Sequence, residues 1–529
     1  MKTRDFHLPG RSPVYAREGI AATSHPLASV AAIETLKAGG SAADAAVTAA
    51  AVLSVVEPAM TGIGGDCFCL VAKPDVPVWG YNGSGRAGAA VTTDKLRQQG
   101  LPRKIPATSP HAVTVPGAID AWEAILQAHG RFGLDRALQP AIRYAEEGFV
   151  IAPRVAADWA TTIDKLKPHA GSRKYYLIDG ASPAVGSVLR LPALAATLRA
   201  IAAGGSRAFY QGAIAADIAA TVQAAGGLLA AEDLAHHRGD VVTPISTSYR
   251  GLDVVELPPN GQGLTALVLL NILEQFDLGR LDPSGPERLH LALEAARLAF
   301  GVRDTHLADP AHMREPVAGL LDKGFAKKLG RLLDPDKRVP LPQAPKPGSD
   351  TIYLTVVDRD RMAVSLINSL YSAFGTGICT EQTGVMLHNR GTGFVLDPQH
   401  PNTIAPGKRP MHTVIPALTM RDGRCAMSFG VMGADYQPMG HAHVVTNMVD
   451  YGMDVQAAID APRMFFEGET TEVERGIPAA TIEGLKARGH NVAFRPMPLG
   501  GGQAIVIDWE RGVLIGGSDP RKDGCAIGY

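Results

Sequence analysis

Residues 350–378 read DTIYLTVVDRDRMAVSLINSLYSAFGTGI, and this stretch decides the fold. From Ile352 to Val356 the apolar residues Ile, Leu and Val alternate with Tyr and Thr, which predicts a β-strand that begins at Thr351. The polar run DRDR at 358–361 predicts a turn, and residues 362–367 predict a second strand. The stretch therefore predicts two consecutive strands joined by a short turn.

A proline-rich segment, residues 331–350, precedes the first of these strands. It holds five prolines together with Gly348 and Ser349, a composition typical of exposed linkers without regular structure. Before it, apolar residues at helical spacing dominate, and after it short strands are frequent. The sequence alone thus predicts a mixed α/β protein with a helix-rich part, a linker and a strand-rich part.

The expected elements are spread along the whole chain. We predict helices at 25–39, 42–56 (with Ser41 as its N-cap), 118–129, 136–147, 193–203, 213–225, 264–276, 287–303, 441–450 and 455–461. Further short strands are predicted at 67–71, 254–257, 413–420 and 504–508.

Bulk composition excludes several classes of protein. Of the 529 residues, 46% are hydrophobic and only 19% are charged, so the chain can bury a large core and is not disordered. The formal net charge is −1 and no long run of one sign occurs, which argues against a nucleic-acid surface or a polybasic membrane patch. We expect a small-molecule substrate instead.

Cysteine usage and the N-terminal residues bear on the compartment. Five cysteines at irregular spacing give neither a disulfide framework nor a zinc pattern, and Cys67 and Cys69 are expected to be buried thiols on one face of a strand. Residues 1–16 lack the apolar core of a secretory signal, and the longest apolar segment, 45–56, is too short to span a bilayer. We expect a soluble cytoplasmic protein, or a periplasmic one if a signal has been removed.

A series of motifs in fixed order resembles the gamma-glutamyltranspeptidase family. Besides the stretch at 350–378, the motifs are LKAGGSAADAAV (36–47), EPAMTGIGGD (57–66), TVPGAIDAW (114–122), ELPPNGQG (256–263), PGKRP (406–410), YGMDVQAAIDAPR (451–463) and SDPR (518–521). The resemblance implies an α+β Ntn-hydrolase fold, an αββα sandwich of two stacked antiparallel sheets between helical layers. It also implies autocatalytic cleavage between Asp350 and Thr351. The products would be a large subunit, 1–350, and a small catalytic subunit, 351–529, that associate as one intertwined domain without a cofactor or metal.

The resemblance places the catalytic groups on four residues. Thr351 is the nucleophile, and its α-amino group, freed by cleavage, has the pKa near 8 that suits a general base at neutral pH. Ser369 matches a hydroxyl residue that hydrogen-bonds the nucleophile. Gly433 and Ala434, in FGVMGADYQP (429–438), match a glycine pair whose backbone N–H groups stabilise the oxyanion.

Substrate-binding positions depart from the family pattern. Arg86 in NGSGRAG (82–88) matches an arginine that clamps a substrate carboxylate. Where typical members hold the α-amino group of a γ-glutamyl substrate with polar or acidic residues, this chain has Tyr371, Arg390 and Gly393. His412 and Thr413 replace a serine pair, with His412 either a pocket residue or a buried structural histidine. The short connection 394–409 suggests an open pocket.

Arg390 would repel an ammonium and attract an anion, so we expect an amidase for an acidic acyl group. The alternatives are γ-glutamyl hydrolysis or transfer, as with glutathione; glutaryl-type or oxamate-type amides that lack the α-amino group; and a non-catalytic binding protein with the Ntn fold. A metal-dependent hydrolase is disfavoured because no HExxH motif occurs. A homo-oligomer is compatible with the sequence.

Overall fold

The strands predicted from residue 351 onward form a hairpin at the centre of a seven-stranded antiparallel sheet. The computed structural model describes residues 10–101, 103–340 and 351–529. Strand β10 (Ile352–Val357) pairs with β11 (Ala363–Ser369) in a register that sets Ile352 opposite Asn368. The full order of this sheet is β19 (Cys525–Gly528), β2 (Ile20–Thr23), β10, β11, β3 (Asp66–Lys73), β4 (Val76–Gly83) and β7 (Asp240–Val242).

A second seven-stranded antiparallel sheet stacks on the first. Its order is β1 (Val14–Ala16), β18 (Val513–Ser518), β17 (Gly501–Asp508), β13 (Arg424–Met432), β12 (Ala417–Arg421), β9 (Leu252–Glu256) and β8 (Ile245–Tyr249). One buried cluster joins the facing sides of the two sheets, with Tyr353 and Phe68 from the first sheet and Leu418 and Ile505 from the second. This apolar layer between the sheets is the inner core of the sandwich.

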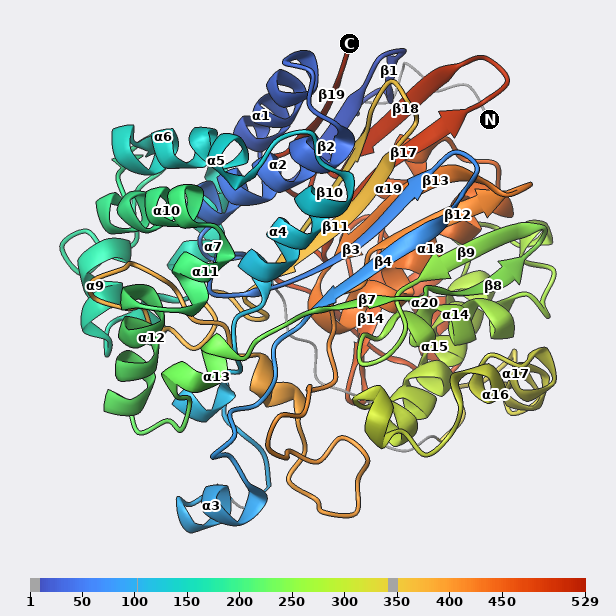
Figure 1. Cartoon of the computed structure of the whole chain (residues 1–529). Coiled ribbons are helices and arrows are strands. Elements are labelled where there is room, and N and C mark those ends of the chain that lie inside the picture. Colours follow the sequence, from blue (N-terminus) through green and yellow to red (C-terminus); the bar gives the residue numbers. More distant parts are fainter. Residues whose placement is uncertain (1–9, 102, 341–350) are drawn as a thin grey trace.

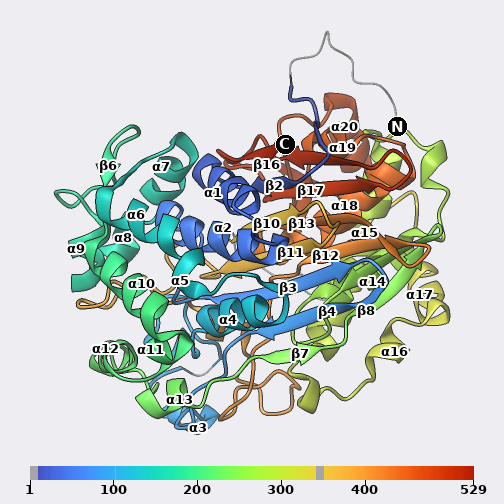
Figure 2. The same cartoon turned by 45° about the horizontal axis from the view of Figure 1, so that its top comes forward.

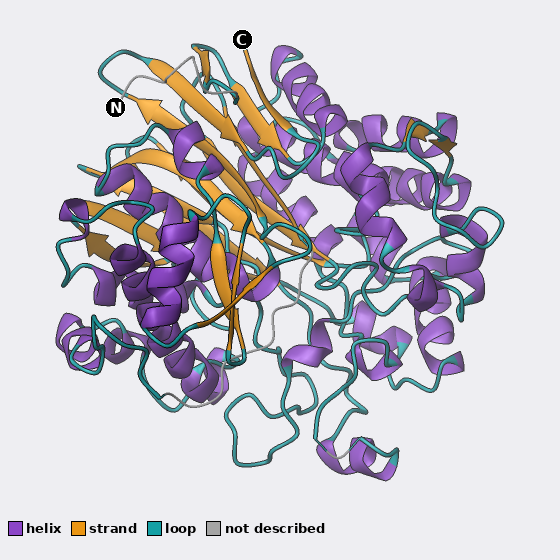
Figure 3. Cartoon of the chain, turned by 180° about the vertical axis from the view of Figure 1, so that it is seen from behind, coloured by secondary structure: helices purple, strands orange, loops and turns teal. Residues whose placement is uncertain are grey.

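Helices cover the outer face of each sheet, as Figure 1 and the view from behind in Figure 3 show. Over the first sheet lies a cluster built by α1 (Pro26–Lys37), α2 (Ala42–Val56), α4 (Ala118–His129), α5 (Leu134–Ala137), α6 (Gln139–Glu147), α7 (Pro153–Ala160), α8 (Ile163–Leu166), α9 (Ala170–Tyr176), α10 (Pro192–Gly204), α11 (Ser206–Tyr210), α12 (Ala213–Ala224) and α13 (Ala231–Ala235). Over the second sheet lie α14 (Gly263–Leu273), α15 (Pro286–His306), α16 (Val317–Leu320), α17 (Lys323–Gly330), α18 (Gln437–Val449), α19 (Val455–Asp460) and α20 (Ala479–Ala487). The αββα sandwich predicted from the family resemblance is confirmed.

Smaller elements decorate this frame. A three-stranded sheet consists of β14 (Met464–Glu467), β15 (Thr470–Val473) and β16 (Asn491–Phe494), and a two-stranded one of β5 (Phe149–Val150) and β6 (Val188–Leu189). Helix α3 (Thr93–Gln98) projects from the body of the molecule in Figure 1, and α9 to α13 form a lobe beyond α2 in Figure 2. Among the described residues, no helix is both long enough and apolar enough to cross a membrane.

Local sequence explains where several elements begin and end. Helix α2 starts after Ser41, whose hydroxyl accepts from the Asp44 N–H while the Asp44 carboxylate accepts from the Ser41 N–H, a capping box. The single helix predicted over 136–147 is wrong: the structure has α5 and α6, with Pro140 in the first turn of α6, where its missing N–H is tolerated. The strand predicted over 413–420 starts only at Ala417, because Pro416 has no N–H to donate to a sheet ladder.

Both sheets combine strands from before and after the segment 341–350. The first sheet takes β2, β3, β4 and β7 from the earlier part of the chain, and β10, β11 and β19 from the later part. The second sheet takes β1, β8 and β9 from the earlier part and its other four strands from the later part. The helix-rich part of the sequence therefore supplies half of the strands in the sandwich, which its composition did not indicate.

Candidate functional site

The candidate site lies at one end of three adjacent strands of the first sheet. Thr351 directly precedes β10, Ser369 ends β11, and Asp66 begins β3. The β10–β11 register, continued by one residue, sets Thr351 opposite Ser369, and the β11–β3 register sets Ser369 opposite Asp66. All three residues are fully buried, and the Oγ1 of Thr351 lies 3.0 Å from the Oγ of Ser369. The sheet thus fixes a row of polar side chains around the predicted nucleophile.

Ser369 links the predicted nucleophile to a buried arginine. Its Oγ accepts a hydrogen bond from the Tyr371 N–H at 2.8 Å and one from Arg390 Nη2 at 3.4 Å. Arg390 Nη1 donates to Thr413 Oγ1 at 2.8 Å, and the guanidinium lies 4.3 Å from the centre of the Tyr371 ring. Sequence positions up to 62 residues apart, 351 and 413, are therefore brought together as predicted substrate-binding and catalytic groups.

Asp66 is the acidic group of this cluster. Its Oδ2 lies 3.1 Å from His412 Nε2 and 3.5 Å from His388 Nδ1, and its Oδ1 accepts from the N–H groups of Gly85 and Gly117, each at 3.1 Å. Gly85 has no room for a side chain, since a Cβ there would lie 1.5 Å from the carbonyl oxygen of Val115. The backbone therefore approaches Asp66 closely enough to satisfy a buried carboxylate.

Burial and charge shift the pKa values of the cluster in opposite directions. Burial alone would raise the pKa of Asp66, but His388, His412 and Arg390 together hold it well below its usual range. Burial, and then the charge of Arg390, lowers the pKa of His412 to about 3, and burial lowers the pKa of Arg390 to about 10. At neutral pH the site therefore holds a carboxylate, a guanidinium and a neutral His412.

A neutral, buried His412 predicts that acid destabilises the fold. In the unfolded chain the imidazole takes a proton below pH 6.5, whereas in the folded chain it stays neutral to about pH 3, so stability falls as pH drops through this window. Each such imidazole is worth up to about 1.4 kcal/mol per pH unit. We expect denaturant unfolding at pH 7, 6 and 5 to show a smaller loss for His412→Gln than for the unmodified protein. His236→Gln, at an exposed position, is the control and should keep the full slope; an equal slope in all three proteins would contradict the expectation.

The predicted oxyanion loop connects to the same cluster through Gln262. Its Nε2 donates to the carbonyl oxygens of Thr413, at 2.7 Å, and Ala434, at 2.8 Å, and its Oε1 accepts from Arg303 Nη1 at 2.8 Å. Gly433 has φ 127° and Ala434 has φ 47°, so both residues occupy the left-handed half of backbone space. The loop therefore keeps a glycine-type turn although its second residue is alanine.

This turn predicts opposite effects for two single substitutions. Ala434→Gly removes a Cβ that costs about 1–2 kcal/mol at positive φ, which exceeds the roughly 0.5–1 kcal/mol entropy cost of glycine, so we expect stabilisation of up to about 1 kcal/mol. Gly433→Ala should destabilise, because its φ suits only glycine and its Cβ would lie 3.1 Å from the Cα of Gly500. Denaturant midpoints of the two variants check this, and a loss of stability in Ala434→Gly would show that the turn is different.

Arg86 stands apart from these residues. Its guanidinium is about two-fifths exposed and lies 3.5 Å from Asp240 and 3.7 Å from Asp309, and it donates to the Gly407 carbonyl at 3.2 Å. The sequence links it to the cluster only through its neighbour Gly85, which donates to Asp66. Asp350, the other side of the predicted cleavage point, lies outside the described residues.

Sequence reasoning missed Asp66, His388 and Gln262 as members of the site. Asp66 and Gln262 lie in the motifs 57–66 and 256–263, which signal importance but no role. A better signal was available in Arg390 itself, because a buried arginine requires a nearby acidic group and GIGGD ends in one.

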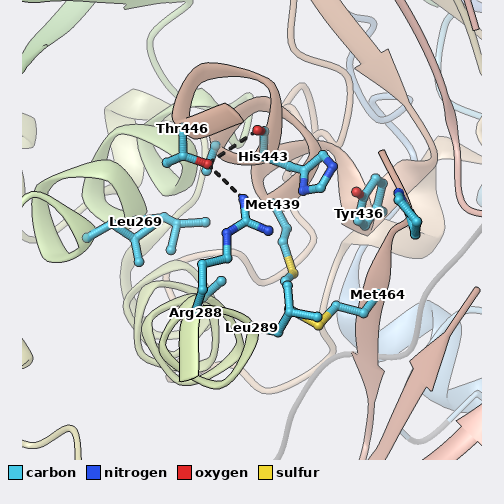
Figure 4. Close-up of a pocket in the computed structure, with 12 residues that line it drawn as sticks. Leu269, Arg288, Leu289, Tyr436, Met439, His443, Thr446 and Met464 are labelled. Carbon is cyan, nitrogen blue, oxygen red and sulfur yellow. Dashed lines mark hydrogen bonds between the residues drawn. The ribbon is translucent and has the colours of Figure 1, made fainter. Parts of the chain in front are cut away.

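A cavity lies next to the end of the predicted oxyanion loop, beyond Tyr436 (Figure 4). Arg288, Met439, His443 and Met464 line it, and Arg288 donates to Thr446 Oγ1 at 3.1 Å. With a volume of about 20 Å³ it has room for a single water. None of the predicted catalytic or substrate-binding residues lines it, so it is a packing defect behind the site rather than the substrate pocket.

Comparison with known proteins agrees with this architecture. The profile of the Gamma-glutamyltranspeptidase family matches residues 28–529. The chain is 39% identical to the glutathione hydrolase-like YwrD proenzyme of Bacillus subtilis, over 95% of this chain and 97% of that one, and 35% identical to the oxamate amidohydrolase proenzyme of Klebsiella pneumoniae, over 97% and 98%. The crystal structure of cephalosporin acylase from Bacillus halodurans superimposes with a TM-score of 0.93 at 38% identity, covering 100% of this chain and 99% of that one.

Sandwich topology, the profile match over nearly the whole chain and these relatives together identify the protein as an enzyme: the chain belongs to the gamma-glutamyltranspeptidase family of Ntn-type amidohydrolases, whose relatives are made as proenzymes.

Proposed function

We propose that the protein cleaves itself before Thr351 and then hydrolyses an amide whose acyl group is anionic and carries no ammonium. The observation that carries this proposal is the buried Arg390 guanidinium, which is separated from the Thr351 hydroxyl by the hydroxyl of Ser369 alone. A guanidinium at this point attracts a carboxylate and repels an α-ammonium. The division into fragments 1–350 and 351–529 belongs to the same proposal.

The proposed reaction has two stages. Thr351 Oγ1 adds to the amide carbon, its proton passes to the freed α-amino group and on to the leaving nitrogen, and the C–N bond breaks to give an ester and an amine. Water then adds to the ester, the C–O bond to Thr351 breaks, and the acid and the threonine hydroxyl are released. The N–H groups of Gly433 and Ala434 are the proposed donors to the oxyanion in both stages.

Two related proteins support an acyl group without the α-amino function. The names of the oxamate amidohydrolase and the cephalosporin acylase describe amides whose acyl parts are not γ-glutamyl. The glutathione hydrolase-like relative keeps γ-glutamyl hydrolysis as the second candidate. Arg390 decides between them in favour of the first, because a γ-glutamyl α-ammonium would have to approach a buried cation.

A matched pair of substrates tests the proposal. Glutaryl-p-nitroanilide and γ-glutamyl-p-nitroanilide have the same chain length and leaving group and differ only in the α-ammonium. We expect a higher kcat/KM for the glutaryl compound, by about tenfold or more, since 1.4 kcal/mol of repulsion suffices for that ratio. A clear preference for γ-glutamyl-p-nitroanilide would refute the proposed role of Arg390.

Further parts of the proposal have separate checks. Stimulation by glycylglycine would identify a transferase rather than a hydrolase, and a single uncleaved band on a denaturing gel would identify a non-catalytic protein. The clamp role of Arg86 requires that a substrate carboxylate displace Asp240 and Asp309. We place the protein in the cytoplasm, or in the periplasm if a signal is removed, and its five unpaired thiols suit the reducing compartment.

A further inference from the structure

Ser369 acts as a ruler between the nucleophile and the cation. Its Oγ is 3.0 Å from Thr351 Oγ1 and 3.4 Å from Arg390 Nη2, so the nucleophilic oxygen and the guanidinium can be no farther apart than these two lengths laid end to end. The ruler is rigid, because Ser369 is fully buried at the end of β11 and its Oγ also accepts from the Tyr371 N–H. The cation therefore has a fixed, short distance to the reacting atom.

Arg390 is held at this point by contacts on several sides. Thr413 Oγ1 accepts from Nη1 at 2.8 Å, the Tyr371 ring covers one face, and the Asp66 carboxylate attracts the charge from within the core. The residue is fully buried, so rotation of its side chain toward solvent would break all of these contacts. Among the residues that the structure describes, none accepts a hydrogen bond from Arg390 Nε, which leaves donor capacity for a ligand.

The same positions also limit the room for an acyl chain. Tyr371, Arg390 and His412 bring three large side chains to this end of the sheet, and His412 is held between Asp66 and the ring of Phe68, 4.5 Å away. His412 is fully buried and packed, so it cannot move aside to lengthen the site.

Chain length can be compared with this ruler. A reacting carbonyl carbon lies about 3–3.5 Å from the nucleophile, and a carboxylate oxygen lies about 2.7–2.9 Å from a guanidinium nitrogen that donates to it. A carboxylate bonded directly to the carbonyl carbon, or one methylene away, meets both conditions in a bent pose. In an extended glutaryl group the carboxyl carbon lies about 5 Å beyond the carbonyl carbon, at about 1.5 Å per C–C bond, and overshoots the guanidinium.

The geometry points to a short dicarboxylic half-amide as the substrate class: an acyl group whose carboxylate is attached directly to the scissile carbonyl or through one methylene, as in oxalyl and malonyl amides. This inference rests on the proposed amidase function and adds the length of the acyl group to it. Arg390 and Thr413 are then specificity-determining residues that read chain length as well as charge.

A homologous series of simple amides tests the inference on the autoprocessed enzyme. Oxamate, malonamate, succinamate and glutaramate share the leaving group, ammonia, and differ only in methylene count. We expect kcat/KM for oxamate or malonamate to exceed that for glutaramate by at least tenfold, and oxalate or malonate to inhibit more strongly than glutarate. Equal or greater activity and inhibition with the five-carbon compounds would overturn the inference while leaving the proposed function intact.

The outcome that defeats the proposed function is different. If γ-glutamyl-p-nitroanilide is hydrolysed and every half-amide of the series is inert, the anionic acyl group without ammonium is wrong. The inhibition series needs no turnover of the half-amides, so it reports on chain length even then.

A variant provides an independent check of the ruler. Arg390→Gln shortens the side chain and removes the charge, and we expect the ratio of oxamate to glutaramate activity to fall by at least tenfold. Thr413→Ser keeps the hydroxyl that accepts from Arg390 and should keep the ratio of the unmodified enzyme. An unchanged ratio in Arg390→Gln, measured on protein that has cleaved itself, would show that Arg390 does not read chain length.

Discussion

Replacement of Thr351 by valine is expected to leave the chain as one full-length polypeptide and to lower amide hydrolysis on the order of 10⁴-fold or more. The substitution exchanges a hydroxyl for a methyl group at constant shape, in a position that is fully buried beside Ser369. Because the hydroxyl is both the proposed agent of self-cleavage and the proposed nucleophile, a single change should remove both. A denaturing gel with N-terminal sequencing of the smaller fragment reports the first effect, and ammonia release reports the second.

The control for this prediction is Thr351→Ser, which keeps a hydroxyl and should retain cleavage and a measurable part of the activity. The folded state of Thr351→Val can be checked by its unfolding midpoint, which should remain close to that of the unmodified protein. Full activity in an uncleaved protein, or in Thr351→Val, would remove the basis of the proposed mechanism.

Asp66→Asn is expected to cost about 3–5 kcal/mol of the free energy of unfolding, because it leaves buried charge without its partner. The carboxylate is fully buried, faces His388 and His412, and is the acidic group that raises the pKa of Arg390 against the effect of burial. Asparagine keeps the shape and one oxygen acceptor, so the change isolates the charge. Denaturant unfolding at pH 7 measures the loss.

Two further variants define what this loss means. Asp360→Asn breaks a solvent-exposed ion pair with Arg131 and should cost less than about 1 kcal/mol. The double variant Asp66→Asn with Arg390→Gln should lose less stability than the two single losses combined, since neither charge then remains alone. Additive losses would indicate that Asp66 and Arg390 do not interact, and the electrostatic account of the site would fail.

Features that depend on neighbouring residues could be predicted from the sequence. The capping box at Ser41, the alternation after Thr351 and the apolar runs of α4 and α15 are local signals, and the elements appear within a few residues of the expected places. The errors also have local causes that involve proline, at Pro140 and at Pro416. The strands of the earlier part were underestimated because β1, β2 and β7 are only three or four residues long.

Asp66 could not be assigned from its own surroundings in the sequence. Its partners come from residues 85, 117, 388 and 412, and only the packing of β3 against the loops that follow β4 and β11 brings them together. Arg390 shows the same limit: its charge was predicted to select an anion, whereas its distance from the nucleophile depends on the strand register at Ser369.

Interleaving of early and late strands has a consequence for the nicked protein. Strand β10 follows the proposed cut and hydrogen-bonds β2, which belongs to the other polypeptide, on one side and β11 on the other. Severing one peptide bond therefore frees no module: both pieces should melt in one cooperative transition, co-purify without a covalent link, and fail to regain the native state if each is made alone. Maturation in such a scaffold changes the chemistry of one amine while leaving the mechanics of the whole molecule untouched.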